Sequence, residues 1–250
     1  MNGPNVSTAA PLSCDYWFFD FPCPRCAGIV FSGEQSAAYG TETFGRQVKT
    51  CCFFFFGGIV MRALEEKILK EGKIFPGEIL NVGSFLNQQI DSVFCMEMGK
   101  EAARLFADST ITKILTVEAS GIAFAVSAGA ALGVPMAFAK KHKSANVGGD
   151  VFHASVRSYT HGTVNEIVIS RDYLQKGDKV LLADDFLASG EALRGLAELC
   201  RQAEAEIVGA VVAVEKWYQG GGDSLRKEGI RVESLAKIRK MTDDSIEFCQ

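Results

Sequence analysis

The chain has 250 residues and a formal net charge of −4 at pH 7. Its length suits one α/β domain with additional segments, since domains typically run ~100–200 residues. A hydrophobic content of 48% and a charged content of 22% are those of an ordinary soluble globule. The small acidic excess argues against a nucleic-acid partner, which usually needs a basic domain. It is compatible with a phosphorylated small molecule, which needs only local positive groups.

Residues 1–60 differ from the rest of the chain. They show no sustained helical or strand period, and they mix Gly, Pro and Ser with clustered aromatic residues. The apolar run at 51–61 is shorter than the ~20 residues that span a bilayer, so we expect no membrane partner. We expect 1–60 to be an N-terminal extension, either disordered or translated from a mis-chosen start codon, with a genuine flexible tail as the alternative. The functional domain is then 61–250.

The cysteines are distributed unevenly. Five of the eight lie within residues 1–60, and three are scattered through the remainder. Scattered cysteines are typical of reduced thiols rather than of a disulfide framework, and we expect a cytoplasmic location. Cys23-Pro-Arg-Cys26 has the spacing of a redox or zinc motif, but all three histidines lie far downstream. We therefore expect no metal site there.

The first elements of the domain alternate between helix and strand. Apolar residues at helical spacing, followed by a glycine, predict a helix over 61–72. The stretch 80–91 is unusually polar for a connection between two helices. Residues 91–108 read as a second helix with Asp91 as its N-cap, and 111–117 read as a strand.

Glu118-Ala-Ser-Gly121 follows this strand and leads into an apolar helix that ends near Gly133. Backbone N–H groups at such a turn, together with the positive end of the helix, form a candidate anion site. Taken alone, the turn favours a simpler interpretation in which Ser120 is only a helix N-cap.

The next strand, 134–139, runs into Lys140, Lys141 and Lys143 and then a Gly-rich loop. A run of lysines is usually a solvated face. At the carboxyl edge of a sheet, however, it can neutralise a leaving anion while the loop closes over it. Residues 152–159 and 164–169 then alternate as a hairpin, which interrupts the strand–helix rhythm as an insertion over an active site would.

The most informative motif is a pair of adjacent acids, Asp184 and Asp185, that follows the apolar run 180–183. The run has the character of a buried parallel strand, and open α/β sheets bind ligands at the carboxyl ends of their strands. The small residues at 188–190 let backbone N–H groups close on an anion at the start of the next helix. A helix N-cap is the alternative for one acid, but the pair and the turn together favour a sugar phosphate.

The remaining elements are a helix to Gln202, a strand at 207–214 and short elements to the end. Lys216 and Trp217 follow that strand. Trp217 offers a flat apolar face for a purine, and Lys216 can donate to an exocyclic oxygen; a strand-end lysine and a core tryptophan are the alternative. Strands that alternate with helices predict a parallel sheet with helices on both faces.

The segment 179–192 resembles the phosphoribosyl-diphosphate motif of type I phosphoribosyltransferases, in which an apolar strand ends in two acids before a loop of Thr-Gly-Gly-Thr type. Glu191 stands where Gly is usual, and Ala192 where Thr is usual. Xanthine phosphoribosyltransferases share a modified loop of this kind. The resemblance to them covers nearly all of 61–250 and includes the hood pattern Ser-Phe-Leu-Asn-Gln-Gln-Ile-Asp at 84–91.

The resemblance implies the type I phosphoribosyltransferase fold: a twisted, mainly parallel sheet with helices on both faces, a β-hairpin flap and a small hood. It implies transfer of the phosphoribosyl group from phosphoribosyl diphosphate (PRPP) to xanthine. It also implies Mg²⁺ carried by PRPP rather than by a dedicated metal site, and a homodimer.

The resemblance also assigns roles to individual residues. The expected catalytic pair is Asp184 and Asp185, which hold the ribose hydroxyls. The expected PRPP-binding residues are Ala188, Ser189, Gly190, Glu191, Ala192, Ser120, Gly121, Lys140 and Lys141. The expected xanthine-binding residues are Leu80, Asn87, Lys216 and Trp217. Because Glu191 would repel a phosphate, we expect its side chain to point away.

Other functions share parts of these motifs. A nucleoside triphosphatase would explain the acid pair, but no Gly-x-x-x-x-Gly-Lys-Ser/Thr occurs. A receiver domain would carry its acids on its first strand. A non-catalytic regulator on the same fold remains open, although residues 1–60 contain only Arg25, Arg46 and Lys49 as basic residues. A transferase that prefers guanine or hypoxanthine also remains open.

Overall fold

The computed structural model describes residues 62–141, 150–157 and 164–249. The predicted extension at 1–60, Lys143 with the loop that follows it, and the tip of the predicted hairpin lie outside these residues. No helix among the described residues is long and apolar enough to cross a membrane.

A six-stranded sheet lies at the centre, with the order β10-β9-β8-β7-β3-β4. The strands are β3 (Lys113–Val117), β4 (Met136–Ala139), β7 (Lys179–Leu187), β8 (Glu206–Lys216), β9 (Val232–Met241) and β10 (Ile246–Phe248). All neighbouring pairs from β9 to β4 are parallel, and β10 is antiparallel to β9. The predicted mainly parallel sheet is confirmed.

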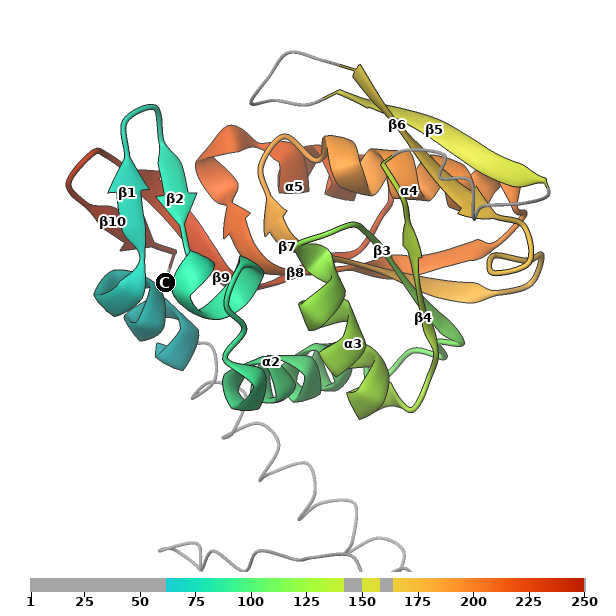
Figure 1. Ribbon diagram of the computed structural model, residues 1–250, viewed down its shortest axis with the longest axis horizontal. Coiled ribbons are helices and arrows are strands. Elements are labelled where there is room, and N and C mark those ends of the chain that lie inside the picture. The colour runs from blue at the N-terminus through green and yellow to red at the C-terminus, as the bar shows by residue number, and fades with distance from the viewer. Residues whose placement is uncertain (1–61, 142–149, 158–163, 250) are drawn as a thin grey trace, which may run out of the picture. The chain divides into compact units, whose positions relative to one another are not determined.

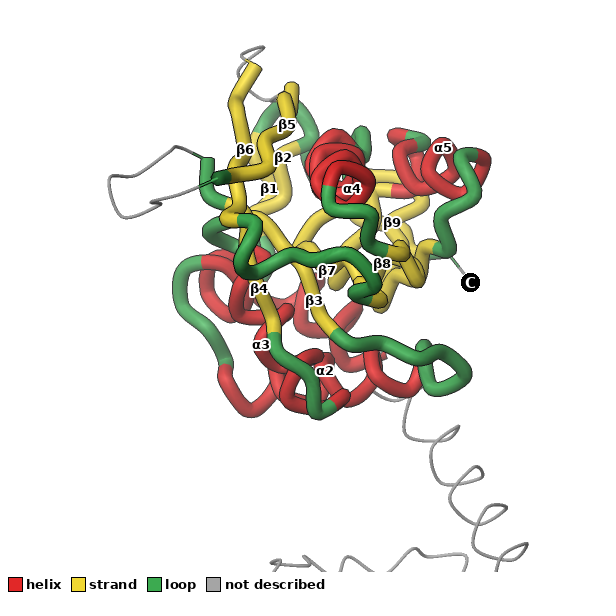
Figure 2. Tube along the Cα trace, turned by 90° about the vertical axis from the view of Figure 1, so that its right-hand side faces the viewer, coloured by secondary structure: helices red, strands yellow, loops and turns green. Residues whose placement is uncertain are grey.

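Helices cover both faces of this sheet (Figures 1 and 2). Helices α2 (Ser92–Leu105) and α3 (Gly121–Leu132) lie on one face, and α4 (Glu191–Gln202) and α5 (Gly221–Lys227) lie on the other. Strand β7 packs against both layers of helices, because its side chains point alternately to the two faces of the sheet. Leu181 and Ala183 belong to one apolar cluster, and Val180 and Leu182 to the other. A strand buried on both faces explains the continuous apolar run in the sequence.

The helix ends follow their local residues. Residues 62–71 are helical, and Gly72 ends that helix by donating to the Ile68 carbonyl at 2.9 Å. The Asp91 carboxylate accepts a hydrogen bond from the Phe94 N–H at 3.1 Å, so the predicted N-cap of α2 is confirmed. Gly133 follows α3 in the left-handed region at φ 70°, which a residue without Cβ adopts at little cost.

Two hairpins flank the sheet. The hood consists of β1 (Lys73–Phe75), β2 (Ile79–Asn81) and the π-helical turn η1 (Gly83–Asn87). The hood strands were not predicted, since three residues are too few to show an alternating pattern. The flap consists of β5 (Val151–Arg157) and β6 (Val164–Ser170), which pair antiparallel, so the predicted hairpin is confirmed.

The largest differences from the predicted strand boundaries occur at the end of β7 and after Val214. Strand β7 does not end at Ala183 but continues to Leu187, because these residues still pair with β8. Its pairing with β3 stops at Leu182. Asp184 and Asp185 therefore lie within β7, on the part that extends past β3. After Val214 only short elements were expected. Strand β8 instead runs to Lys216, and the short helices η2 (Trp217–Gln219) and α5 follow it. Strand β9 is ten residues long.

Candidate active site

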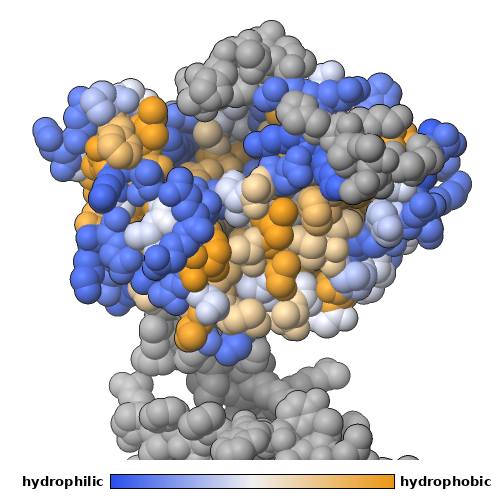
Figure 3. All heavy atoms as spheres, viewed as in Figure 1, coloured by the Kyte–Doolittle hydropathy of each residue, from blue (hydrophilic) through white to orange (hydrophobic). Residues whose placement is uncertain are grey.

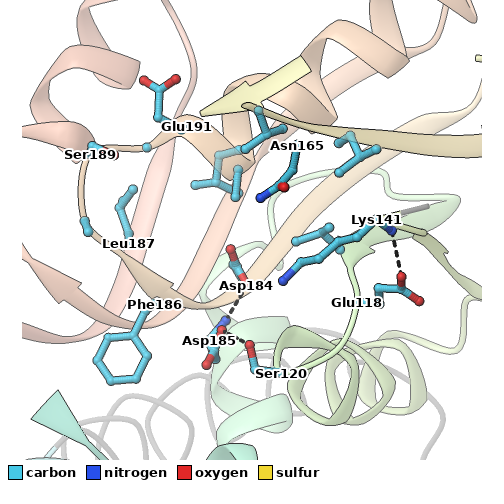
Figure 4. A pocket seen from close by; sticks show the side chains of 17 residues that line it. Glu118, Ser120, Lys141, Asn165, Asp184, Asp185, Phe186, Leu187, Ser189 and Glu191 are labelled. Carbon is cyan, nitrogen blue, oxygen red and sulfur yellow. Dashed lines mark hydrogen bonds between the residues drawn. The ribbon is translucent and has the colours of Figure 1, made fainter. Parts of the chain in front are cut away.

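A cleft of about 240 Å³ lies at the carboxyl end of β7. Its walls come from the turn after β3, the end of β4, the flap, and the loop that joins β7 to α4. The side chains that line it include Glu118, Ser120, Lys141, Val156, Asn165, Ile167, Asp184, Asp185, Ser189 and Glu191 (Figure 4). Several segments that are distant in the sequence thus meet at one edge of the sheet, where α/β proteins bind ligands.

The two acids are almost fully buried, with 6% of each residue exposed. The Asp185 carboxylate accepts hydrogen bonds from Ser120 Oγ at 2.9 Å and from Asn87 Nδ2 at 3.3 Å. The Asp184 carboxylate is directed into the cleft (Figure 4). Burial raises the pKa of Asp184 well above its usual value, and the negative charge of Asp185 adds to the rise. The positive charge of Lys141 acts in the opposite direction and favours the ionised form of Asp184.

Ser120 is the N-cap residue of α3, as the simpler interpretation expected, but its side chain makes no capping hydrogen bond. Its hydroxyl donates to Asp185 instead. The next residue, Gly121, allows α3 to begin directly against the acids. A Cβ atom there would lie 2.4 Å from Thr116 Oγ1 and 2.9 Å from Asp184 Oδ1. The N-terminus of α3 is thus held beside the acid pair.

The loop from Ala188 to Ala192 leads into α4. Gly190 takes φ 85°, which favours glycine, and it is the N-cap of α4. Gly221 supports the loop, because a Cβ atom there would lie 2.1 Å from the Ala188 carbonyl oxygen. Glu191 forms an ion pair with Arg194 at 3.0 Å, and its carboxylate points away from the acid pair (Figure 4).

The two described lysines of the basic run lie at the end of β4. The Lys141 backbone N–H donates to Glu118 Oε1 at 2.6 Å, and its side chain extends toward Asp184 (Figure 4). The Lys140 backbone exchanges two hydrogen bonds of 2.8 Å with Val168 of the flap. This segment therefore joins the sheet, the flap and the cleft.

The predicted base-binding residues lie around the hood and are not among the residues that line the cleft. Lys216 Nζ donates to the Glu78 carbonyl at 2.7 Å, and burial lowers the pKa of Lys216. Leu80 is 7% exposed and packs in the apolar core. Trp217 is 42% exposed, so the alternative of a core tryptophan is wrong. Of the four, Asn87 contacts the acid pair directly.

Asn165 and Ile167 of the flap line the cleft, Gly195 supports the flap, and none of the three was predicted. Asn165 and Ile167 lie on one face of β6, toward the cleft, while Glu166 on the other face contacts His153 at 2.8 Å. Gly195 of α4 lies against the flap, since a Cβ atom there would lie 2.3 Å from Val156 Cγ2. Asn165 could have been recognised as a cleft residue because it is a polar side chain on an otherwise apolar face of the hairpin.

Residues 88–238 match the family model of the phosphoribosyl transferase domain. The chain belongs to the phosphoribosyltransferase family. The resemblance predicted from the acid pair and its loop is thereby confirmed at the level of the family, and so is the type I fold.

This phosphoribosyltransferase is similar to curated relatives over nearly their whole length. It is 49% identical over 188 residues to the xanthine phosphoribosyltransferase of Lactiplantibacillus plantarum, covering 75% of this chain and 96% of that protein. It is 48% identical over 190 residues to a xanthine phosphoribosyltransferase of Bacillus cereus, covering 76% and 96%.

Among solved structures, the adenine phosphoribosyltransferase from Thermoanaerobacter pseudethanolicus has a TM-score of 0.58 at 20% identity, covering 70% of this chain and 99% of that chain. At this identity the similarity shows a shared fold.

Proposed function

We propose that the protein transfers the 5-phosphoribosyl group of PRPP to xanthine, giving xanthosine 5′-monophosphate and diphosphate. The observation that carries the proposal is one cleft in which a buried acid pair lies between the start of α3 and the start of α4. Helix N-termini bind anions, and carboxylates accept hydrogen bonds from hydroxyls. PRPP carries phosphate, hydroxyls and diphosphate in that combination. Its relatives of almost half-identical sequence are named for xanthine.

Different residues of the cleft bind different parts of PRPP. Asp184 and Asp185 bind the ribose hydroxyls and stabilise positive charge that develops on the sugar. The backbone of 188–192 binds the 5′-phosphate. Ser120 and Gly121 bind the diphosphate, with Lys140 and Lys141 beside it. These groups act by position and charge rather than by forming a covalent bond to the sugar.

The base lies between the hood and the end of β8. Asn87 offers both a donor and an acceptor, Lys216 donates to an oxygen of the purine, and Leu80 and Trp217 provide apolar contacts. The hydrogen bond between Asn87 and Asp185 brings the proposed base site next to the proposed ribose site. This proximity is required when the base bonds to the sugar.

The residues of the cleft fit Mg²⁺ brought by PRPP. Mg²⁺ is usually bound through one or two carboxylates together with substrate phosphates, and the Asp184 carboxylate is directed into the cleft. The described residues contain no group of three or more His, Cys, Asp or Glu side chains that would hold a metal by themselves. Bound there, the ion would neutralise charge on the diphosphate. Asp184 would help to hold the ion, and the positive charge of Lys141 would balance negative charge on the diphosphate.

Purified full-length protein tests this function. With PRPP and Mg²⁺ we expect diphosphate release to be fastest with xanthine, because Lys216 and Asn87 are matched to an oxidised purine. Diphosphate and the nucleotide product are both measured for xanthine, guanine and hypoxanthine, and the reaction without base is the control. Faster turnover of guanine or hypoxanthine would support a transferase of different preference. No release with any base would refute the enzyme and favour a non-catalytic regulator.

We also propose a homodimer that forms through α2 and α3. Val93 is 75% exposed and Met96 39% exposed on α2, and Val126 is 50% exposed on the neighbouring α3. Figure 3 shows apolar atoms gathered over the part of the surface where α3 lies. Exposed apolar groups of this kind mark interaction sites.

Sedimentation of the full chain tests the homodimer. We expect a dimer in the native protein and a shift toward monomer in Val93→Glu, because a charge would be buried in the interface. Tyr173→Glu, at an exposed aromatic residue after the flap, is the control and should remain dimeric. A native protein that sediments as a monomer would exclude the proposed interface.

A further inference from the structure

Arg194, on the first turn of α4, makes three separate contacts around the loop of residues 188–192. Its Nη1 donates to the Ser189 carbonyl at 2.9 Å and to Glu191 Oε1 at 3.0 Å. Its Nε donates to Glu228 Oε1 at 3.0 Å. We propose that Arg194 is a positioning residue for the 5′-phosphate: it keeps the carbonyl and carboxylate oxygens of this loop turned away from the cleft. The proposal rests on the proposed function, which assigns the phosphate to this loop.

The carbonyl oxygens of the loop have to point away from a bound phosphate. A phosphate is bound by N–H groups, and a carbonyl oxygen directed at it would repel it. The arginine side chain satisfies one carbonyl of the loop, and the helix backbone satisfies the next one whatever the side chain at 194. The Arg194 side chain donates to Ser189 O, and the Arg194 backbone N–H donates to Gly190 O at 3.0 Å. With these oxygens held from the helix side, the N–H groups of the loop remain available to the cleft.

Glu191 is the acidic residue of this loop. Its carboxylate is at the first position of α4, where the helix dipole stabilises a negative charge. The same position adjoins the proposed phosphate site, where a negative charge is unfavourable. The ion pair with Arg194 holds the carboxylate outside the cleft. Arg194 therefore compensates, three residues later, for an acid at a position where such loops commonly have glycine.

Arg194 is itself held by a contact outside the loop. Glu228, directly after α5, accepts from Arg194 Nε and also from Ser224 Oγ at 3.2 Å. The hydrogen bond from Arg194 lowers the pKa of Glu228. The Glu228 carboxylate thus accepts from Nε and the Glu191 carboxylate from Nη1 of the guanidinium. Together they fix the orientation of its planar donors. On the other side, Gly221 packs against the loop. Arg194 has no need to touch PRPP in order to act.

Steady-state kinetics of the full-length protein test the proposal. Arg194→Met should raise the KM for PRPP by about tenfold, with kcat and the KM for xanthine within about twofold, because it weakens ground-state phosphate binding rather than the chemical step. Arg201→Met is the matched control. It removes another arginine of α4 that pairs with a glutamate three residues earlier, Glu198, in an exposed position. Its KM for PRPP should not change.

A second substitution distinguishes repulsion of the phosphate by the Glu191 carboxylate from structural damage caused by Arg194→Met. Glu191→Gln alone should lower the KM for PRPP by about twofold, since it removes a negative charge near the phosphate. In the Arg194→Met background it should recover at least about threefold of the lost affinity, because the freed carboxylate is then absent. No rescue, or a parallel loss of kcat and of both KM values, would overturn the positioning role.

Direct binding distinguishes failure of this proposal from failure of the proposed function. Calorimetry measures the affinity of the protein for ribose 5-phosphate and for PRPP in the absence of a base. If the native protein binds ribose 5-phosphate but does not turn over xanthine, the substrate assignment fails while Arg194→Met is still expected to weaken binding. If Arg194→Met binds ribose 5-phosphate as tightly as the native protein, the positioning role fails while the enzyme assignment stands.

Discussion

Replacing Asp185 by Asn should lower kcat by about 100-fold while leaving the protein folded, since removal of one preorganised charge contact costs an active site that much. The substitution keeps the size of the side chain but removes its negative charge and replaces one of the two oxygens that accept hydrogen bonds from Ser120 and Asn87. That charge is the proposed partner of the ribose hydroxyls and of the positive charge that develops on the sugar. Turnover is measured with xanthine and PRPP, and folding by circular dichroism.

A matched control for this substitution is Asp108→Asn. The Asp108 side chain is 71% exposed, and its carboxylate pairs with Arg231 away from the cleft. Its kcat should match that of the native protein. A kcat for Asp185→Asn within about twofold of the native value would remove Asp185 from the active site. A loss of the circular dichroism signal would instead assign the acid a structural role.

Replacing Arg226 by Met should cause the largest loss of stability. Glu215 on β8 is fully buried, with both carboxylate oxygens 3.0 Å from Arg226 and Ser234 Oγ at 2.5 Å from one of them. Without the arginine, a buried carboxylate loses its cation, which costs ~3–5 kcal/mol. For a protein of this size the Tm should fall by roughly 10 °C, as measured in a thermal melt.

An exposed ion pair provides the comparison. Lys176 and Glu204 pair with side chains that are 76% and 67% exposed, so Lys176→Met should leave the Tm almost unchanged. Adding Glu215→Met to Arg226→Met should recover part of the lost stability, because the unpaired charge is removed. Equal small shifts for Arg226→Met and Lys176→Met would contradict the importance of the buried pair.

The sheet and the acid pair could be predicted because their signals are local. The run at 180–183 had to be a buried strand, and the acids that follow it had to lie near a strand end. The position of β7 relative to β3 was not local. Only the pairing of the strands shows that β7 extends past β3 and places Asp184 and Asp185 beside α3. For this reason the strand was predicted to end four residues too early.

Supporting residues were harder to predict than the acids they serve. Gly221 lies more than thirty residues from Ala188, and its requirement for glycine arises only where the two segments meet. The same holds for Asn165, which reaches the cleft because the flap folds back over α4. Glu191 pairs with Arg194, whose partners include Glu228 from the residues directly after α5. Contacts between segments, rather than patterns along one segment, determine these positions.

The hydrogen bond from Lys216 to the Glu78 carbonyl has a consequence for selectivity. The donor proposed to read the base already has a partner, so an incoming purine exchanges one hydrogen bond for another and gains little net affinity from this contact. A purine without an oxygen at the matching position would displace the hood carbonyl and leave a partly desolvated ammonium group with no acceptor. Discrimination would then come from the penalty imposed on the wrong base rather than from extra attraction for the right one.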